Sequence, residues 1–239
     1  MPDVVIFPDY QGRSSLTGDF ARALRNAVPG VTVVAAINGV DVGPFVDSTT
    51  EYVYCRSNFN SAVLTGLTRA AELGERVARV DTNEHDIRLL ATAFSLLNDA
   101  DIVILDMVYD SSTLRPESVE YYHTNFVIPS IVSFATNHRF SLSGCHGFMS
   151  FRRTALERIL PIVEEVLKIA NDTELHAQRP PIRWSADSLL PIIADRLGLR
   201  VKVVRQPATV LRENSSEKCA RQAWDLRCLL DVLDRTLPA

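Results

Sequence analysis

The chain has 239 residues, of which 46% are hydrophobic and 23% charged, and its formal net charge is −4. This length suffices for one large domain, and a negative charge is not typical of a general nucleic-acid-binding protein. No stretch approaches the ~18 consecutive apolar residues of a membrane span, and the N-terminus lacks a signal-peptide pattern. The four cysteines share no CxxC spacing, so reduced thiols and a cytoplasmic location are expected.

The first half of the chain alternates between strand-like and helix-like segments. Short apolar runs predict the strands, and apolar residues three and four positions apart predict the helices. Such alternation is typical of a doubly wound, mainly parallel sheet with right-handed crossovers. In chain order, the predicted elements are strand 4–7, helix 16–28, strand 31–37, strand 52–54, helix 60–73, strand 77–80, helix 87–97 and strand 101–106.

The second half is less regular. Helical and extended signals mix from 111 to 143, and the composition of residues 171–183 is typical of a loop. Thr154 and Glu157 form a capping-box pattern that predicts the start of a helix, in which Pro161 is expected to cause a kink or a break. The remaining predicted elements are helix 185–197, strand 200–204 and helix 217–235.

A group of polar and acidic residues, Asp81 to Asp86, follows the apolar strand at 77–80. Ligands of open α/β sheets bind beyond the carboxyl ends of the strands. Mg²⁺ and Mn²⁺ take oxygen ligands and often need only one or two protein carboxylates beside phosphate oxygens, so Asp81 is the first candidate ligand. Asn83 could add a carbonyl oxygen, and His85 a nitrogen that suits Mn²⁺. A capping aspartate and an exposed first-turn histidine are the structural alternatives.

Several motifs in this order resemble those of one enzyme family. Val80-Asp81-Thr-Asn83-Glu-His85 and the later Asp99-Ala-Asp101-Ile-Val-Ile-Leu are similar to motifs of the family 2 glycosyltransferases with the GT-A fold. The likeness is greatest to their dolichyl-phosphate mannosyltransferase-like branch, and it covers about residues 4 to 218. Asn83 and Ile37 stand where the family has acids. The other similar segments are 60–70, 143–156, 184–187 and 212–218.

This resemblance implies a single GT-A domain over residues 1–239 with a mixed, mainly parallel central sheet. Residues 1–110 would form the nucleotide-sugar-binding half, 111–218 the acceptor-binding half and 219–239 a C-terminal helix. The implied reaction is the metal-assisted, inverting transfer of a hexose from a UDP- or GDP-linked donor. Mn²⁺ or Mg²⁺ would be the cofactor, and the sequence does not identify the acceptor.

The resemblance also assigns roles to individual residues. Asp187 is the candidate general base, because a hydroxyl acceptor must lose its proton as it attacks the anomeric carbon; its alternative is a helix N-terminal acid. Guanidinium groups suit phosphate, which favours the arginines near 152. Donor-binding candidates are Pro8, Asp9, Tyr10, Asn38, Gly39, Asp81, Arg212 and Lys218. Candidates for the acceptor or a phosphate are Gly144, His146, Arg152, Arg153 and Trp184.

Other functions stay open. A degenerate or binding-only protein would account for Ile37 and Asn83. The acceptor could be a lipid phosphate, which needs no base, or a modified base in DNA, although the net charge disfavours DNA. A sugar-nucleotide pyrophosphorylase is disfavoured because residues 8–13 contain one glycine and no Gly-rich phosphate loop. The arginines that could contact DNA are Arg152, Arg153, Arg179 and Arg183.

Overall fold

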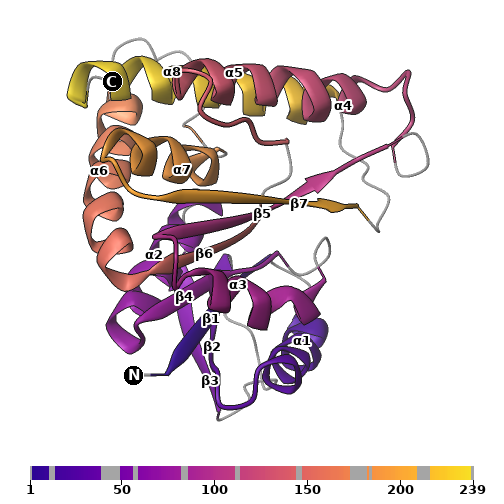
Figure 1. The fold of residues 1–239 in the computed structure, drawn as a ribbon, viewed down its shortest axis with the longest axis vertical. Helices are drawn as coiled ribbons and strands as arrows, with labels where there is room; N and C mark the ends of the chain where they lie inside the picture. The colour runs from indigo at the N-terminus through magenta and orange to yellow at the C-terminus, as the bar shows by residue number, and fades with distance from the viewer. Residues whose placement is uncertain are drawn as a thin grey trace. The chain divides into compact units, whose positions relative to one another are not determined.

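Seven β-strands form the central sheet of the computed structural model (Figure 1). The structure describes residues 2–10, 14–38, 49–55, 59–81, 86–110, 114–143, 147–172, 182, 185–208 and 216–237. In chain order, the strands are β1 (Asp3–Tyr10), β2 (Thr32–Asn38), β3 (Thr50–Cys55), β4 (Arg76–Arg79), β5 (Ile102–Val108), β6 (Phe148–Arg152) and β7 (Val201–Pro207).

The strands are hydrogen-bonded in the order β3-β2-β1-β4-β6-β5-β7. The pairs β3–β2, β2–β1 and β1–β4 are parallel, and β6 runs antiparallel to β4. The sheet is therefore mixed and mainly parallel, which confirms the predicted α/β fold class. Helices connect many of the strands, as expected for parallel neighbours.

The helices and helical turns vary widely in length. None of the helices in the described part of the chain is long and apolar enough to cross a membrane. In chain order they are α1 (Ser14–Ala27), α2 (Phe59–Leu73), the 3₁₀ turn η1 (Ile87–Leu89), α3 (Leu90–Leu96), α4 (Val119–Tyr122), the π-helical turn η2 (His123–Val127), α5 (Ile128–Ala135), α6 (Arg153–Asp172), α7 (Ala186–Arg196) and α8 (Ser216–Thr236).

The chain divides into two compact units. The first contains Met1–Ile104 and Gly147–Glu157, and the second contains Leu105–His146 and Arg158–Ala239. The chain therefore returns to the first unit with β6 after it has entered the second. The halves expected for the donor (1–110) and the acceptor (111–218) are defined by function and stay a prediction.

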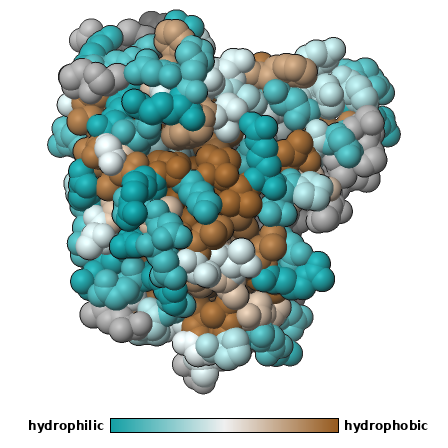
Figure 2. All heavy atoms as spheres, in the orientation of Figure 1, coloured by the Kyte–Doolittle hydropathy of each residue, from teal (hydrophilic) through white to brown (hydrophobic). Residues whose placement is uncertain are grey.

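The core of the first unit lies along β1 and β2. Residues 4–7 and 33–36 of these strands are all 0% exposed, as expected for parallel strands that are covered on both faces. Helix α2 packs against β1, β2 and β3. Phe7 contacts Phe20 of α1 edge to face, with ring centroids 5.1 Å apart. On the face shown in Figure 2, hydrophobic residues (brown) also reach the surface in several places between hydrophilic ones (teal).

Helix α6 differs from its prediction at two points. It begins at Arg153, directly after β6, whereas the capping-box pattern placed its start at Thr154. It also continues through Pro161 to Asp172, so the expected break does not occur there. Proline removes one backbone donor but does not end a helix whose apolar face is buried, and the side chain of Val163, two positions on, is 0% exposed.

Candidate functional site

The carboxyl ends of three neighbouring parallel strands lie at one edge of the sheet in the first unit. In the register of β1 and β2, Asp9 lies opposite Ile37 and Tyr10 opposite Asn38. β4 lies on the other side of β1, where the backbone N–H of Val80 donates to the carbonyl of Ile6 over 3.0 Å. This edge therefore brings together four donor-binding candidates that are far apart in the sequence: Pro8, Asp9, Asn38 and Asp81.

These candidates differ in how far a solute can reach them. Asp9 is 4% exposed, whereas the side chain of Asp81 is 26% exposed. Asn38 is partly buried at the end of β2. Among the described carboxylates of this edge, Asp81 is therefore the one that a metal ion can approach most readily. Tyr10 belongs to β1 by its backbone, while Gly39, Asn83 and His85 lie outside the described residues.

Asp81 forms an ion pair with a residue that the sequence analysis did not select. Nη2 of Arg79 donates to Oδ1 of Asp81 over 2.8 Å, and the Arg79 side chain is 0% exposed. Arg79 lies in the middle of the sheet, with Ile6 of β1 opposite it on one side and Met149 of β6 on the other. The carboxylate of Asp81, the candidate metal ligand, is thus oriented by the buried guanidinium of Arg79.

The sequence contains a signal that could have identified this arginine. In extended backbone, residues two positions apart project from the same side, so an arginine at the last position of β4 is well placed to reach the acid at 81, just beyond the strand. An arginine within the otherwise apolar run Val77-Ala78-Arg79-Val80 is also unusual, because arginine is almost never fully buried unless it is paired. Together these facts predict an Arg79–Asp81 pair.

Asp86, the last acid of the group that begins at Asp81, forms hydrogen bonds with Arg88. Asp86 caps η1 by accepting from the backbone N–H of Arg88 over 3.0 Å, and it also accepts from Nε of Arg88 over 2.8 Å. The hydrogen bonds from Arg88 lower the pKa of the Asp86 carboxyl below its ordinary value. This pair is a local cap of η1, and Asp86 was not among the predicted ligands.

The described part of the chain provides a limited set of metal ligands. It contains no group of three or more His, Cys, Asp or Glu side chains that could hold a metal ion. A single accessible carboxylate such as Asp81 still fits Mg²⁺ or Mn²⁺, which commonly bind through one or two carboxylates together with substrate phosphates and water. The donor set therefore fits an ion that binds with a nucleotide diphosphate rather than a closed protein cage.

Arg152 and Arg153 both make extensive contacts within the protein. Nε of Arg152 donates to the carbonyls of Leu97 and Ala100 over 2.8 and 3.1 Å, at the end of α3. Arg153 pairs with Glu75 at 3.1 Å. These contacts support a structural role for both arginines, and a phosphate would have to compete with them.

The candidate base Asp187 belongs to the second unit, in the first turn of α7. Its Oδ1 accepts from the backbone N–H of Ser188 over 3.0 Å. Ser185, which precedes the helix, has a left-handed backbone conformation with φ +73°, and its hydroxyl donates to the carbonyl of Gln222 in α8 over 3.0 Å. A left-handed serine is uncommon and is retained where the surrounding structure requires it. The start of α7, and with it Asp187, is therefore fixed against α8.

Another acid of the second unit was missed by the sequence analysis. Asp106, near the end of β5, is 2% exposed, and its Oδ1 accepts from the backbone N–H of Ser143 over 2.8 Å. Asp106 thereby holds the first residue of the segment 143–156, which resembles the glycosyltransferase family. Lys218 lies in the first turn of α8. The other predicted residues of this half, Gly144, His146, Trp184 and Arg212, lie outside the described residues.

Solved structures share this architecture at low sequence identity. A mycobacterial protein aligns with 97% of this chain and 74% of its own, with a TM-score of 0.63 and 14% identity. Glucosyl-3-phosphoglycerate synthase from Mycobacterium tuberculosis, in complex with Mn²⁺, uridine diphosphate and phosphoglyceric acid, aligns with 97% of this chain and 78% of its own, with a TM-score of 0.59 and 15% identity.

A third similar structure has a name that does not refer to a glycosyl product. It is 4-diphosphocytidyl-2C-methyl-D-erythritol synthase from Anaerococcus prevotii, which aligns with 95% of this chain and 96% of its own, with a TM-score of 0.53 and 13% identity. No family model and no curated protein matches the sequence. The sheet order and these likenesses show the GT-A fold, as the resemblance in the sequence implied. Membership of the dolichyl-phosphate mannosyltransferase-like branch stays a prediction.

Proposed function

We propose that this protein is a glycosyltransferase that moves a sugar from a nucleotide diphosphate sugar to an acceptor. The observation that carries the proposal is Asp81, a partly exposed carboxylate at the carboxyl end of a central strand of a GT-A sheet. Ligands of open α/β sheets bind at this edge. The buried Arg79 adds a positive charge next to Asp81.

The departing nucleotide diphosphate gains negative charge as the sugar leaves, so groups that stabilise this charge lower the barrier. A bound Mn²⁺ or Mg²⁺ would supply positive charge at the diphosphate, with Asp81 as its ligand and Asn83 and His85 as the further candidates. Arg79 orients the Asp81 carboxylate through the 2.8 Å hydrogen bond. Pro8, Asp9, Tyr10, Asn38 and Gly39, with Arg212 and Lys218, are the residues proposed to hold the nucleotide.

Asp187 is the proposed base for a hydroxyl acceptor. Removal of the acceptor proton makes the oxygen a better nucleophile, and direct attack on the anomeric carbon inverts its configuration. A lipid phosphate is already anionic and needs no base, so Arg152 or Arg153 would matter more for that acceptor. The residues proposed to contact the acceptor or a phosphate are Gly144, His146, Arg152, Arg153 and Trp184.

A nucleotidyl transfer or a binding-only role are the competing functions. The likeness to 4-diphosphocytidyl-2C-methyl-D-erythritol synthase supports nucleotidyl transfer at the level of fold. Ile37 and Asn83 favour a binding-only role, because the family has acids at those positions. Separate incubations with nucleotide sugars and with a nucleoside triphosphate plus a phosphate-bearing acceptor distinguish them. Release of nucleoside diphosphate from a nucleotide sugar indicates sugar transfer or hydrolysis, and release of pyrophosphate from the triphosphate indicates nucleotidyl transfer. Binding without any product indicates the binding-only role.

The test compares two aspartates that each pair with an arginine and are partly exposed, but that lie at opposite ends of the parallel strands. Asp81→Asn keeps an oxygen that can accept from Arg79 but removes the negative charge that a metal needs. Asp3→Asn is the matched control, because Asp3 pairs with Arg76 at 2.7 Å at the other end of the strands and its side chain is 19% exposed. UDP and Mn²⁺, the ligands of the synthase described above, are the first pair to examine.

We expect Asp81→Asn to abolish Mn²⁺-dependent UDP binding, measured by calorimetry, while Asp3→Asn binds as the parent does. Asp187→Asn is expected to leave UDP binding intact and to lower kcat by ~10²–10⁴ for a hydroxyl acceptor. Parental UDP affinity in Asp81→Asn would remove Asp81 from the site. Parental kcat in Asp187→Asn would remove Asp187 from the mechanism.

A further inference from the structure

The helical segment 119–135 of the second unit exposes an unusual amount of apolar surface. Five of its large apolar side chains are exposed, and Phe134 reaches 79%. Large exposed apolar patches on globular proteins mark interaction sites more often than single exposed residues do. We call these five residues the apolar stripe: Val119 52%, Tyr122 57%, Phe126 54%, Val127 39% and Phe134 79%.

The stripe runs along one continuous helical segment. α4, the π-helical turn η2 and α5 follow one another without an interruption from Val119 to Ala135 (Figure 1). Tyr122 and Phe126 contact each other, with ring centroids 5.9 Å apart. Single π-helical turns within α-helices frequently occur at functional sites. The exposed side chains therefore belong to one surface and not to separate loops.

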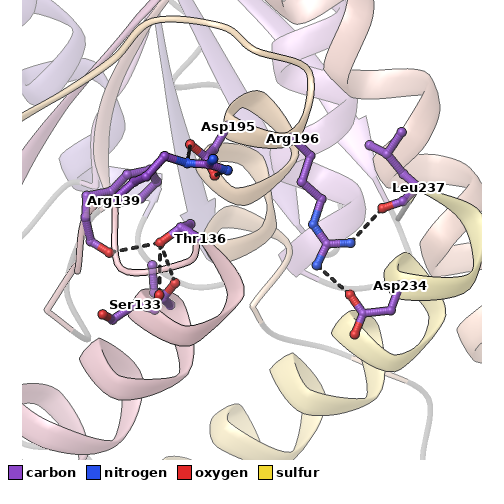
Figure 3. A network of polar contacts seen from close by, with 9 residues as sticks. Ser133, Thr136, Arg139, Asp195, Arg196, Asp234 and Leu237 are labelled. Carbon is purple, nitrogen blue, oxygen red and sulfur yellow. Dashed lines mark hydrogen bonds and ion pairs between the residues drawn. The ribbon is translucent and has the colours of Figure 1, made fainter. Parts of the chain in front are cut away.

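Ion pairs and hydrogen bonds fix this segment within the second unit. Figure 3 shows Arg139, just after α5, paired with Asp195 of α7, with Nε to Oδ1 at 2.6 Å. The neighbouring Arg196 donates to Asp234 and to the carbonyl of Leu237 at the end of α8, the latter over 2.7 Å. α5, α7 and α8 are thus joined at their C-terminal ends. A fixed apolar surface loses little conformational entropy when it binds a partner.

The area of the stripe is close to what a dimer needs. With ~150–250 Å² for each aromatic side chain, the exposed fractions of the three aromatic residues correspond to roughly 300–480 Å² of apolar surface, and the two valines add to it. A standard interface buries ~800 Å² per partner, and homodimer interfaces are ~65% apolar, which amounts to about 500 Å² of apolar surface per copy.

Charge distinguishes a second copy of the chain from other partners. The sequence from Tyr121 to Asn137 contains no Asp, Glu, Lys or Arg, and Glu120, the one charged residue of the segment 119–135, is 4% exposed. The stripe residues themselves are uncharged, so they do not repel their own image. An anionic membrane would instead require Lys or Arg along the apolar face. A two-fold dimer uses the same patch on both subunits, which a neutral, self-complementary stripe satisfies.

We infer that the apolar stripe is the contact surface of a two-fold symmetric homodimer. The two copies of the segment 119–135 pack against each other, with Tyr122, Phe126 and Phe134 as the main contacts. Exposed aromatic side chains of this kind commonly contribute most of the binding energy of an interface. This dimer does not depend on the proposed transferase activity.

Sedimentation of the full chain tests the dimer over about 1–100 μM, because interfaces of this size have dissociation constants from micromolar downward. The parent protein should sediment with twice the mass of one chain. Phe134→Lys and, separately, Tyr122→Lys should each raise the dimer dissociation constant at least ~30-fold, since hot-spot residues have effects of this size. Tyr54→Lys, at a 46% exposed aromatic residue of β3 in the first unit, is the control.

Circular dichroism and thermal unfolding establish that each variant is folded, and substitutions at such exposed positions seldom prevent folding. A monomeric parent protein over the whole concentration range overturns the proposal. Binding of that monomer to phosphatidylcholine vesicles would identify a membrane as the partner instead. A dimer that neither stripe substitution weakens, or that Tyr54→Lys dissociates, also overturns it.

Discussion

The ion pair between the buried Arg79 and the partly exposed Asp81 is the most consequential contact at the scale of single residues. A guanidinium that is removed from water is costly unless an opposite charge compensates it, and Arg79 is 0% exposed. Asp81 is partly exposed and could regain water if the arginine were removed. The two partners therefore contribute unequally: the arginine depends more strongly on the aspartate for its stability than the reverse.

We expect Asp81→Ala to lower the free energy of unfolding by ~3–5 kcal/mol, because it removes the opposite charge from a buried guanidinium. Arg79→Met should cost less, about 1.5–3 kcal/mol, the usual value of a hydrogen bond to a charged group. Urea unfolding of both variants measures the difference. Arg88→Met is the control, because this arginine is 86% exposed in its pair with Asp86 and its loss should change little.

The opposite order of these two variants would show that Arg79 is stabilised mainly by other contacts. The expected order also affects how Asp81 must be studied. A loss of nucleotide binding in Asp81→Ala could reflect a weakened fold, whereas Asp81→Asn retains an acceptor for Arg79. This is why the binding experiment uses asparagine.

Close packing of α2 on the sheet decides stability at the scale of the elements. A Cβ at Gly66 would lie 2.9 Å from Cβ of Ala36 and 3.1 Å from Cδ1 of Ile6, so the glycine permits the helix to approach β1 and β2 closely. Gly18, in α1, has nothing within 4 Å of the same position. These two helical glycines differ in packing, although both are unfavourable for the helix itself.

Gly66→Ala is expected to destabilise the protein by ~1–3 kcal/mol, as in other overpacked cores. Gly18→Ala should instead stabilise it by ~0.5–1 kcal/mol, because alanine has the higher helix propensity and meets no neighbour there. Thermal unfolding of the two variants gives the signs directly. A stabilising Gly66→Ala would mean that α2 can move away from the sheet at little cost.

The sequence predicted the elements with regular local patterns and missed those that depend on distant contacts. Residues 31–37 are apolar except for Thr32, which predicts a buried strand, and five consecutive positions of β2 are indeed buried. Strand β6 has five residues, and its place beside β4 is determined by pairing with a segment about seventy positions earlier, such as Phe151 with Val77. The helical segment 119–135 was obscured by Pro129, which α5 accommodates at its second residue, where a missing amide donor is tolerated.

In the candidate site too, the position of a residue in the fold could be predicted from the sequence, but its distant contacts could not. The strand-end position of Asp81 follows from the alternation of apolar runs and acids, because ligand sites in α/β sheets occur at such ends. The roles of Arg152 and Arg153 could not be read in this way. Whether an arginine meets a ligand or the carbonyls at the end of α3 depends on the fold around it, and Nη2 of Arg152 donates to the carbonyl of Asn98 over 2.8 Å.

At the scale of the whole molecule, both units contribute proposed site residues. The donor candidates of β1, β2 and β4 lie in the first unit together with Arg152 and Arg153, whereas Asp187 and the donor candidate Lys218 lie in the second. Donor binding can be measured without knowledge of the acceptor, because a bound donor stabilises the folded state by itself. A ligand that binds the folded state alone stabilises it by ~2.7 kcal/mol when its concentration is 100 times the dissociation constant.

For a chain of this length, each kilocalorie per mole raises the unfolding midpoint by ~2–4 °C, so a saturating donor should raise it by about 5–10 °C. We expect this shift with a UDP- or GDP-linked sugar and Mn²⁺ together, and a smaller one with either alone, because the metal and the diphosphate oxygens complete each other's binding site. A panel of nucleotide sugars measured by thermal unfolding, with and without Mn²⁺, identifies the nucleotide. Asp81→Asn should lose the Mn²⁺-dependent part of the shift, and Asp3→Asn should retain it. A panel in which no nucleotide changes the midpoint would contradict a nucleotide-sugar site at the carboxyl edge of the sheet.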